Sequence, residues 1–215
     1  MALALFDLDN TLLNGDSDYS WGLFLAEIGA VDAEQQNKKQ DEFYQQYLNG
    51  TLDILEFLRF QFLPLKQNNL QQLYKWREEY IETIIKPMIA SGKPELIEKH
   101  RDNNDKLVII TATNDFITRP IADLFGVDTL IATNAEFVDG QYTGNVENTP
   151  CFQEGKVTRL KQWLEQNEYS INDSWFYSDS INDLPLLNLV DNPVAVTPDD
   201  RLRAHAQEFH WPIID

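Results

Sequence analysis

Two carboxylates near the start of the chain, Asp7 and Asp9, have the spacing and setting for chemistry. They follow an apolar run, residues 2–6, which predicts a buried strand. In open parallel sheets, the carboxyl ends of the strands line the ligand crevice. With no Lys or Arg beside them, two like charges there call for a cation, and a divalent metal ion is the simplest. One carboxylate can then attack an electrophile, while the other exchanges protons with the leaving group and water. The alternative is an acidic turn after a strand.

Three later segments also carry polar residues at the ends of predicted elements. The apolar run 106–110 ends at Thr111, whose hydroxyl suits a phosphate oxygen. Lys156 opens a helical stretch and supplies a cation that can neutralise a phosphoryl group. The short strand 174–178 runs into oxygen ligands of the kind that Mg²⁺ prefers, Asp179, Asn182 and Asp183. Taken singly, these residues can also be a strand terminator, a solvated lysine and helix N-caps.

In this order, the residues resemble the four motifs of the haloacid dehalogenase superfamily of phosphohydrolases. Those motifs are Asp-x-Asp-x-Thr, a Ser or Thr after the second strand, a Lys, and a final Asp-x-x-x-Asp. The resemblance spans the chain from Asp7 to Asp183. It implies a Mg²⁺-dependent phosphomonoesterase that acts through an aspartyl phosphate, in which positioning and charge neutralisation do most of the catalysis.

The resemblance also assigns a role to each motif residue. Asp7 is the nucleophile, and Asp9 is the general acid and base. The residues assigned to phosphate binding are Thr111, Lys156 and Asn182. The residues assigned to Mg²⁺ are Asp7, Asp9 through its main-chain carbonyl, Asp179 and Asp183.

Composition narrows the choice of partners. The chain has 215 residues and a net charge of 17 minus 35, or -18, which argues against nucleic acid and anionic membranes. Cys151 is the only cysteine, so no disulfide can form within the chain. The apolar start lacks the basic region of a signal peptide, and no stretch approaches the ~20 apolar residues of a membrane span. We expect a cytoplasmic protein that binds a small phosphorylated metabolite. The sequence leaves its oligomeric state open.

The fold class expected is α/β, a Rossmann-like parallel sheet core with an inserted all-helical cap. Residues 14–86 show only helical patterns, which predicts the cap, and residues 1–13 and 87–215 form the core. The cap helices expected are 19–28, 32–48, 52–62 and 70–85, with Pro64 and Pro87 ending the last two. The core alternates strands and helices, with a β-hairpin over residues 136–146 around Asp139-Gly140.

A helical cap after the first motif resembles the phosphoserine phosphatase branch of the superfamily. That branch binds the substrate ammonium through an acidic residue after motif one, which Asp16 matches, with Asp18 just beyond. It binds the substrate carboxylate through a cap arginine. Here the aligned position holds Gln61, and the nearest arginine is Arg59. Asp16 and Asp18 can instead be N-caps.

Acids in the cap without an aligned arginine favour a substrate that has cationic groups and no carboxylate. L-histidinol phosphate, with an ammonium and an imidazole, is the substrate expected. The alternatives are a phosphoserine phosphatase, a phosphotransferase with the same aspartyl-phosphate chemistry, and a catalytically inactive metabolite-binding module.

Overall fold

A computed structural model describes residues 2–215 and contains one seven-stranded sheet with the strand order β4-β3-β2-β1-β5-β6-β7. The strands are β1 (Leu3–Phe6), β2 (Lys106–Asn114), β3 (Thr129–Val138), β4 (Gln141–Glu147), β5 (Trp175–Ser178), β6 (Asn192–Val196) and β7 (Ile213–Ile214). All neighbouring strands are parallel except β3 and β4, which form the antiparallel hairpin expected around Asp139-Gly140. The expected α/β fold is confirmed.

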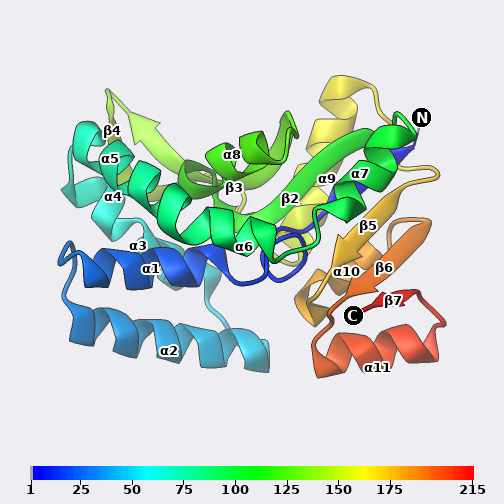
Figure 1. Ribbon diagram of the computed structural model, residues 1–215, viewed down its shortest axis with the longest axis horizontal. Coiled ribbons are helices and arrows are strands. Elements are labelled where there is room, and N and C mark those ends of the chain that lie inside the picture. Colours follow the sequence, from blue (N-terminus) through cyan, green and yellow to red (C-terminus); the bar gives the residue numbers. More distant parts are fainter. Residues whose placement is uncertain (1) are drawn as a thin grey trace.

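The central strand β1 is buried on both faces because helices cover the sheet on each side (Figure 1). Ala4 and Phe6 point to one cluster of buried side chains, and Leu3 and Leu5 point to the other. This alternation follows from the two-residue period of a strand. Helices of the first face are α7 (Glu95–Asp102) and α8 (Asp115–Leu124), and those of the second are α9 (Glu154–Asn167), α10 (Leu184–Leu187) and α11 (Asp200–Glu208).

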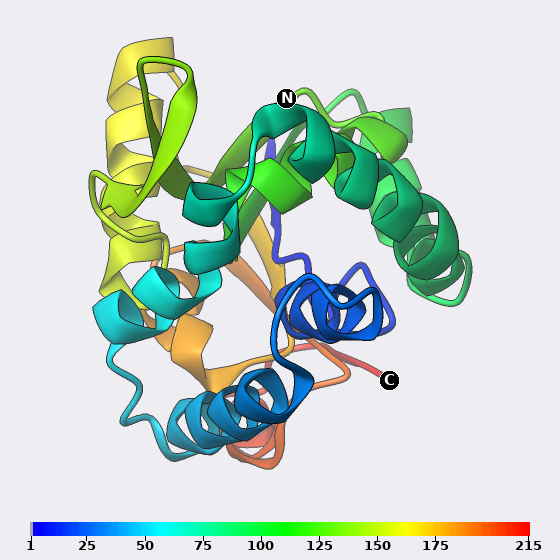
Figure 2. The same cartoon turned by 90° about the vertical axis from the view of Figure 1, so that its left-hand side faces the viewer.

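Between β1 and β2 the chain forms the all-helical cap, which lies beside the carboxyl end of β1 (Figures 1 and 2). Its helices are α1 (Ser17–Glu27), α2 (Ala33–Asn49), α3 (Ile54–Gln61), α4 (Leu63–Gln67) and α5 (Leu70–Tyr80). Asp16, Asp32 and Asp53 cap the first three, because each carboxylate accepts hydrogen bonds from main-chain N–H groups of the first turn. Local sequence therefore sets where these helices begin.

The expected helix end at Pro87 is wrong. From α5 the chain continues through a π-helical turn, η1 (Ile81–Ile85), into α6 (Lys86–Ala90), where Pro87 lies in the first turn. A proline inside an α-helix removes one hydrogen bond and collides with the carbonyl four residues earlier. The wider π turn just before Pro87 changes that pairing, so the helix passes through the proline. Pro64 likewise lies in the first turn of α4.

The second strand is longer than expected. It continues past Ile110 to Asn114, and its register with β3 shifts between these two residues. Thr111 and Thr113 therefore belong to an irregular strand end. Within residues 2–215, no helix is both long and apolar enough to span a membrane.

Candidate active site

Asp7 lies at the carboxyl end of β1, almost fully buried. Its N–H donates to the carbonyl of Tyr177 on the neighbouring strand β5 at 2.9 Å, so the sheet fixes its backbone. Its Oδ1 accepts a hydrogen bond of 2.7 Å from the Lys156 ammonium. Burial raises the pKa of Asp7 to about 7, although the attraction of Lys156 opposes the shift. Asp7 is thus a carboxylate held against a cation at the end of a rigid strand.

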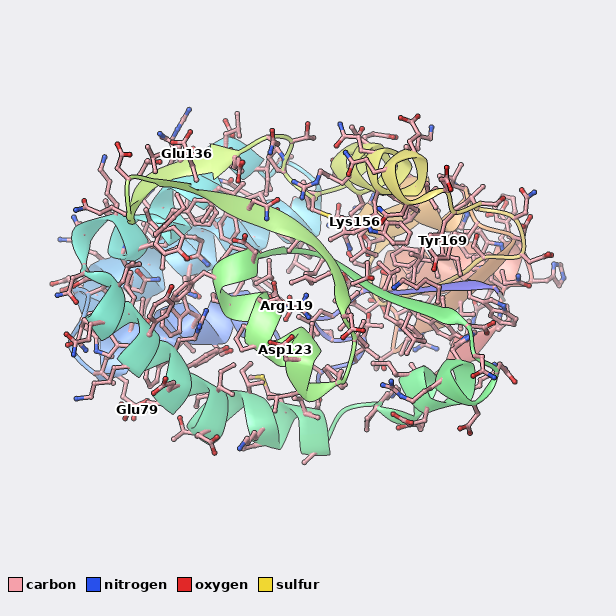
Figure 3. All side chains as sticks on the ribbon, turned by 90° about the horizontal axis from the view of Figure 1, so that it is seen from above. Glu79, Arg119, Asp123, Glu136, Lys156 and Tyr169 are labelled. Carbon is pink, nitrogen blue, oxygen red and sulfur yellow. The ribbon has the colours of Figure 1, made fainter. Side chains whose placement is uncertain are left out.

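Lys156 comes from the first turn of α9, where it is labelled in Figure 3, and its ammonium bridges two carboxylates. Its Nζ donates to Asp7 Oδ1 and to Asp183 Oδ2, both at 2.7 Å, and only 3% of the residue is exposed. Burial lowers the pKa of Lys156, but Asp183 and Asp7 outweigh that effect and raise it. Lys156 therefore stays charged inside the site. Helix α9 can approach this closely because Gly155 has no side chain, and a Cβ there would meet the Pro150 carbonyl.

Asp9 is held by two donors from different elements. The Ser17 N–H at the start of α1 donates to its Oδ1 at 2.6 Å, and the Thr113 hydroxyl on β2 donates to its Oδ2 at 2.8 Å. Burial and the nearby charge of Asp16 raise the pKa of Asp9 to about 6. A carboxyl group with such a pKa can donate and accept protons near neutral pH. No sequence pattern links Thr113 to Asp9, because the two residues are 104 positions apart.

The remaining predicted phosphate ligands also lie in this site. Thr111 is 1% exposed, lines the cavity, and its hydroxyl oxygen accepts from the Thr113 N–H at 3.1 Å. Asn182 is held through its Oδ1, which accepts from the Gln153 side chain at 3.0 Å. The structure thus brings Thr111, Asn182 and Lys156 together around Asp7.

The acidic residues suit a hard divalent cation. The Thr11 hydroxyl lies 3.4 Å from Asp7 Oδ2 and 3.3 Å from Asp179 Oδ1, so one hydroxyl contacts both carboxylates. Burial raises the pKa of Asp179 well above its usual range, and the charges of Asp7 and Asp183 add to the shift. A bound cation would relieve this repulsion.

Among the residues described, no three acidic, His or Cys side chains form a ready-made metal cage. Mg²⁺ does not need one, because it keeps several waters and takes one or two carboxylates plus substrate phosphate oxygens. The all-oxygen set of Asp7, Asp179 and the Asp9 carbonyl therefore fits Mg²⁺. One oxygen of Asp183 is already shared by Lys156 and the Ser178 hydroxyl, each at 2.7 Å.

These residues form one wall of a cavity of about 520 Å³ between core and cap. The cap lines it with acids, amides and rings, namely Asp16, Asp18, Tyr19, Gln40, Phe43, Tyr44, Tyr47, Gln61 and Phe57. No Lys or Arg of the cap is among the cavity-lining residues described. Arg59 is exposed and lies outside the cavity, whereas Gln61 is buried and lines it. The position aligned with the carboxylate-binding arginine thus holds an amide.

The two cap acids differ in what already binds them. Asp16 Oδ1 accepts from the N–H groups of Asp18 and Tyr19 at 2.9 and 2.8 Å, so Asp16 is an N-cap as well as a cavity residue. Asp18 is 7% exposed, and its carboxylate has only side-chain amides as partners, Asn114 at 3.4 Å and Gln61. Burial raises the pKa of Asp18 to about 7. Such a poorly compensated carboxylate is a good partner for a cationic group.

Comparisons with known proteins agree with this geometry. The profile of the haloacid dehalogenase-like hydrolase family matches residues 4–188. The chain is 44% identical over 217 residues to the histidinol-phosphatase of Neisseria meningitidis serogroup C (strain 8013), covering 99% of this chain and 98% of that protein. It is 31% identical to a phosphoserine phosphatase of Mycobacterium tuberculosis, covering 100% of this chain and 70% of that protein.

Two solved structures resemble this one. A protein of unknown function from Bordetella pertussis Tohama I has a TM-score of 0.94 and 42% identity, with 100% of this chain and 98% of that chain covered. A substrate-bound phosphoserine phosphatase has a TM-score of 0.70 and 17% identity, with 99% and 92% covered. At that identity, the second likeness concerns the fold alone.

Proposed function

The chain belongs to the haloacid dehalogenase-like hydrolase family and is a phosphatase of that family, and we propose that its preferred substrate is L-histidinol phosphate. The observation that carries this proposal is the charge of the cavity. The core supplies both lysines that line the cavity, Lys156 beside Asp7 and Lys93, while the cap supplies Asp16 and Asp18 and no cation among its described lining residues. L-Histidinol phosphate has an ammonium and an imidazole for such a pocket and no carboxylate. The 44% identical Neisseria enzyme supports the same substrate.

We assign the two chemical steps to Asp7 and Asp9. The Asp7 carboxylate attacks phosphorus and forms an aspartyl phosphate, while Asp9 gives its proton to the departing alkoxide. Asp9 then takes a proton from water, which attacks the same phosphorus and releases phosphate and free Asp7. Lys156 offsets the negative charge of Asp7 as the phosphate arrives, and Thr111 and Asn182 orient the phosphate oxygens. Mg²⁺, held by Asp7, Asp179 and the Asp9 carbonyl, with Asp183 nearby, would supply further charge neutralisation.

In the cap, Asp18 is the better partner for the substrate ammonium, since its carboxylate is the less compensated of the two. Aromatic rings of the cap, Tyr19 and Tyr44, lie 6.1 Å apart between centroids and can contact the imidazole. The anionic metabolite and the buried, unpaired Cys151 also fit the cytoplasmic location expected from the sequence.

The test is a side-by-side measurement of kcat/KM for L-histidinol phosphate and L-phosphoserine with Mg²⁺. Burying the phosphoserine carboxylate against the cap, which offers no cationic lining residue among those described, costs about 3 kcal/mol and corresponds to a preference of roughly a hundred-fold for histidinol phosphate. Asp18→Asn should raise KM for histidinol phosphate and leave that preference much reduced. Arg59→Ala is the matched control. It should leave kcat/KM unchanged for both substrates, because Arg59 lies outside the cavity.

A preference for phosphoserine that collapses in Arg59→Ala would overturn the substrate assignment. It would mean that α3 rotates to bring Arg59 inward and that the protein is a phosphoserine phosphatase. Adding small alcohols to the assay distinguishes hydrolysis from phosphotransfer, because a phosphotransferase would convert them to phosphate esters.

A further inference from the structure

Tyr47, near the carboxyl end of helix α2 in the cap, contacts the core segment Asp179–Asp183. The carboxyl end of α2 points toward the core (Figures 1 and 2). There the Tyr47 hydroxyl donates a hydrogen bond of 2.7 Å to Ser180 Oγ. The main-chain carbonyl of the same residue accepts from the Asn182 amide at 3.5 Å. One cap residue thus contacts the segment between Asp179 and Asp183 at two points.

The Ser180 side chain organises that segment. Its oxygen also accepts from the Asn182 N–H at 3.2 Å, which caps the short helix η2 (Ile181–Asp183). Ser180 is 4% exposed, so water does not readily replace a lost partner. Ser180 Oγ accepts hydrogen bonds from both the Tyr47 hydroxyl and the Asn182 N–H. It therefore links the position of α2 to the main chain of Asn182.

Gln153 holds the other end of the Asn182 side-chain amide. Its Nε2 donates to Asn182 Oδ1 at 3.0 Å. Its backbone has φ 48° and ψ -121°, a conformation that a residue with a side chain adopts only when its surroundings impose it. Asn182 thus lies between a core residue in a strained conformation and the cap residue Tyr47. Burial, with the charges of Asp179 and Asp183, raises the pKa of Tyr47, so its hydroxyl keeps the proton that it donates.

We propose that Tyr47 is a positioning residue that couples closure of the cap to the alignment of Asn182 and the loop Asp179–Asp183. When α2 lies on the core, the Tyr47 hydroxyl fixes Ser180 and, through it, the loop that carries the phosphate and metal ligands. When the cap opens, the loop loses this contact. The proposal rests on the phosphatase function above for its effect on turnover, but the coupling is a property of the contacts themselves.

Coupling between two sites is reciprocal, which gives a test without turnover. In Tyr47→Phe, which removes only the hydroxyl, amide hydrogen exchange in the segment 177–184 should become faster. In Ser180→Ala, exchange in α2 should become faster as well. Tyr74→Phe is the matched control, because Tyr74 is a cap tyrosine on α5 whose ring stacks on Phe116 and which does not line the cavity that Tyr47 and Ser180 line. It should leave the segment 177–184 unchanged.

In the activity arm, Tyr47→Phe should lower kcat about five- to ten-fold for both phosphoserine and histidinol phosphate, the effect of one lost hydrogen bond. The double variant with Ser180→Ala should be no slower than Ser180→Ala alone, because the same contact is lost in both.

Unchanged exchange in 177–184 of Tyr47→Phe would overturn the proposal, even if kcat fell. So would equal acceleration in Tyr74→Phe, which would indicate general loosening of the cap. A wild-type protein that hydrolyses no phosphomonoester would refute the proposed function, while the exchange experiment would still decide the coupling.

Discussion

Replacing Lys156 with methionine should destabilise the protein by an amount that depends on pH. The methionine keeps much of the volume of the side chain but removes a charge that lies 2.7 Å from both Asp7 and Asp183. Breaking a buried ion pair by removing one partner costs about 3–5 kcal/mol, because the other partner is left charged and buried. Asp7 contributes to this cost only where it is ionised.

The direction of this pH dependence follows from the pKa of Asp7. In the folded protein it is raised to about 7 from 3.8, and the attraction of Lys156 is one of the influences that keep it from rising further. A carboxyl group whose folded pKa exceeds its unfolded value loses stability as pH rises from the unfolded pKa through the folded one. In Lys156→Met the folded pKa is higher still, so this loss extends to higher pH. Within that window, each pH unit costs about 1.4 kcal/mol per group.

The measurement is urea unfolding of the wild type and Lys156→Met without metal at pH 5 and pH 8. Their free energies of unfolding are compared, provided that the m-values agree. The deficit of Lys156→Met should be larger at pH 8 than at pH 5, by about 1.4 kcal/mol from Asp7, whose pKa is about 7 with Lys156 in place. Lys161→Met, an exposed lysine on the same helix, is the control and should show no such trend. Turnover of Lys156→Met should also fall by about 10²–10³, as it does when a preorganised donor is removed.

Equal deficits at the two pH values would refute this reasoning. They would show that the loss comes from packing of the lysine stem and that the carboxylates do not depend on the ammonium. Absence of any deficit would mean that the two hydrogen bonds of Lys156 are not made in solution.

Three further predictions concern the reacting groups. Asp7→Asn should fold normally and lose about a million-fold in turnover, because an amide cannot form the acyl phosphate; more than a few per cent of residual activity would contradict its role. Thr113→Val should raise the pKa of Asp9, since the lost hydrogen bond favours the charged form. The step in which Asp9 acts as base should then reach its half-maximum above pH ~6 in single-turnover profiles, and an unshifted profile would exclude Asp9 as that base. Activity should require Mg²⁺ and fall in Ca²⁺, whose larger coordination number can occupy both oxygens of Asp7; full activity after exhaustive chelation would refute a metal role.

The sequence by itself determined the elements and the order of the chemistry along them. Short apolar runs placed β1, β2 and β5, and each run was followed by a residue of the site. Asp16, one of the two acids considered as N-caps, does cap α1, and Asp32 and Asp53 cap α2 and α3 in the same local way. These signals are local, because a strand face or an N-cap depends on residues only a few positions apart.

The helix end predicted at Pro87 was wrong because of an unusual backbone turn just before the proline. A proline normally ends a helix, but the helical chain continues past Pro87 because the π turn η1 precedes it. A single sequence does not reveal that turn, because packing of the long helix on its neighbours sustains it. The shift of register that extends β2 beyond Ile110 has the same origin in tertiary contacts.

Only the tertiary structure decided which side chains share the cavity. Arg59 and Gln61 are two positions apart, about 200° around a helix, so the docking of α3 decides which of them faces the substrate. The contacts of Asp9 with Thr113 and of Tyr47 with Ser180 join residues 104 and 133 positions apart. The residue pattern along the chain does not predict such pairs. They form because of how the cap packs on the sheet, which the local sequence of the cap or of the sheet does not determine.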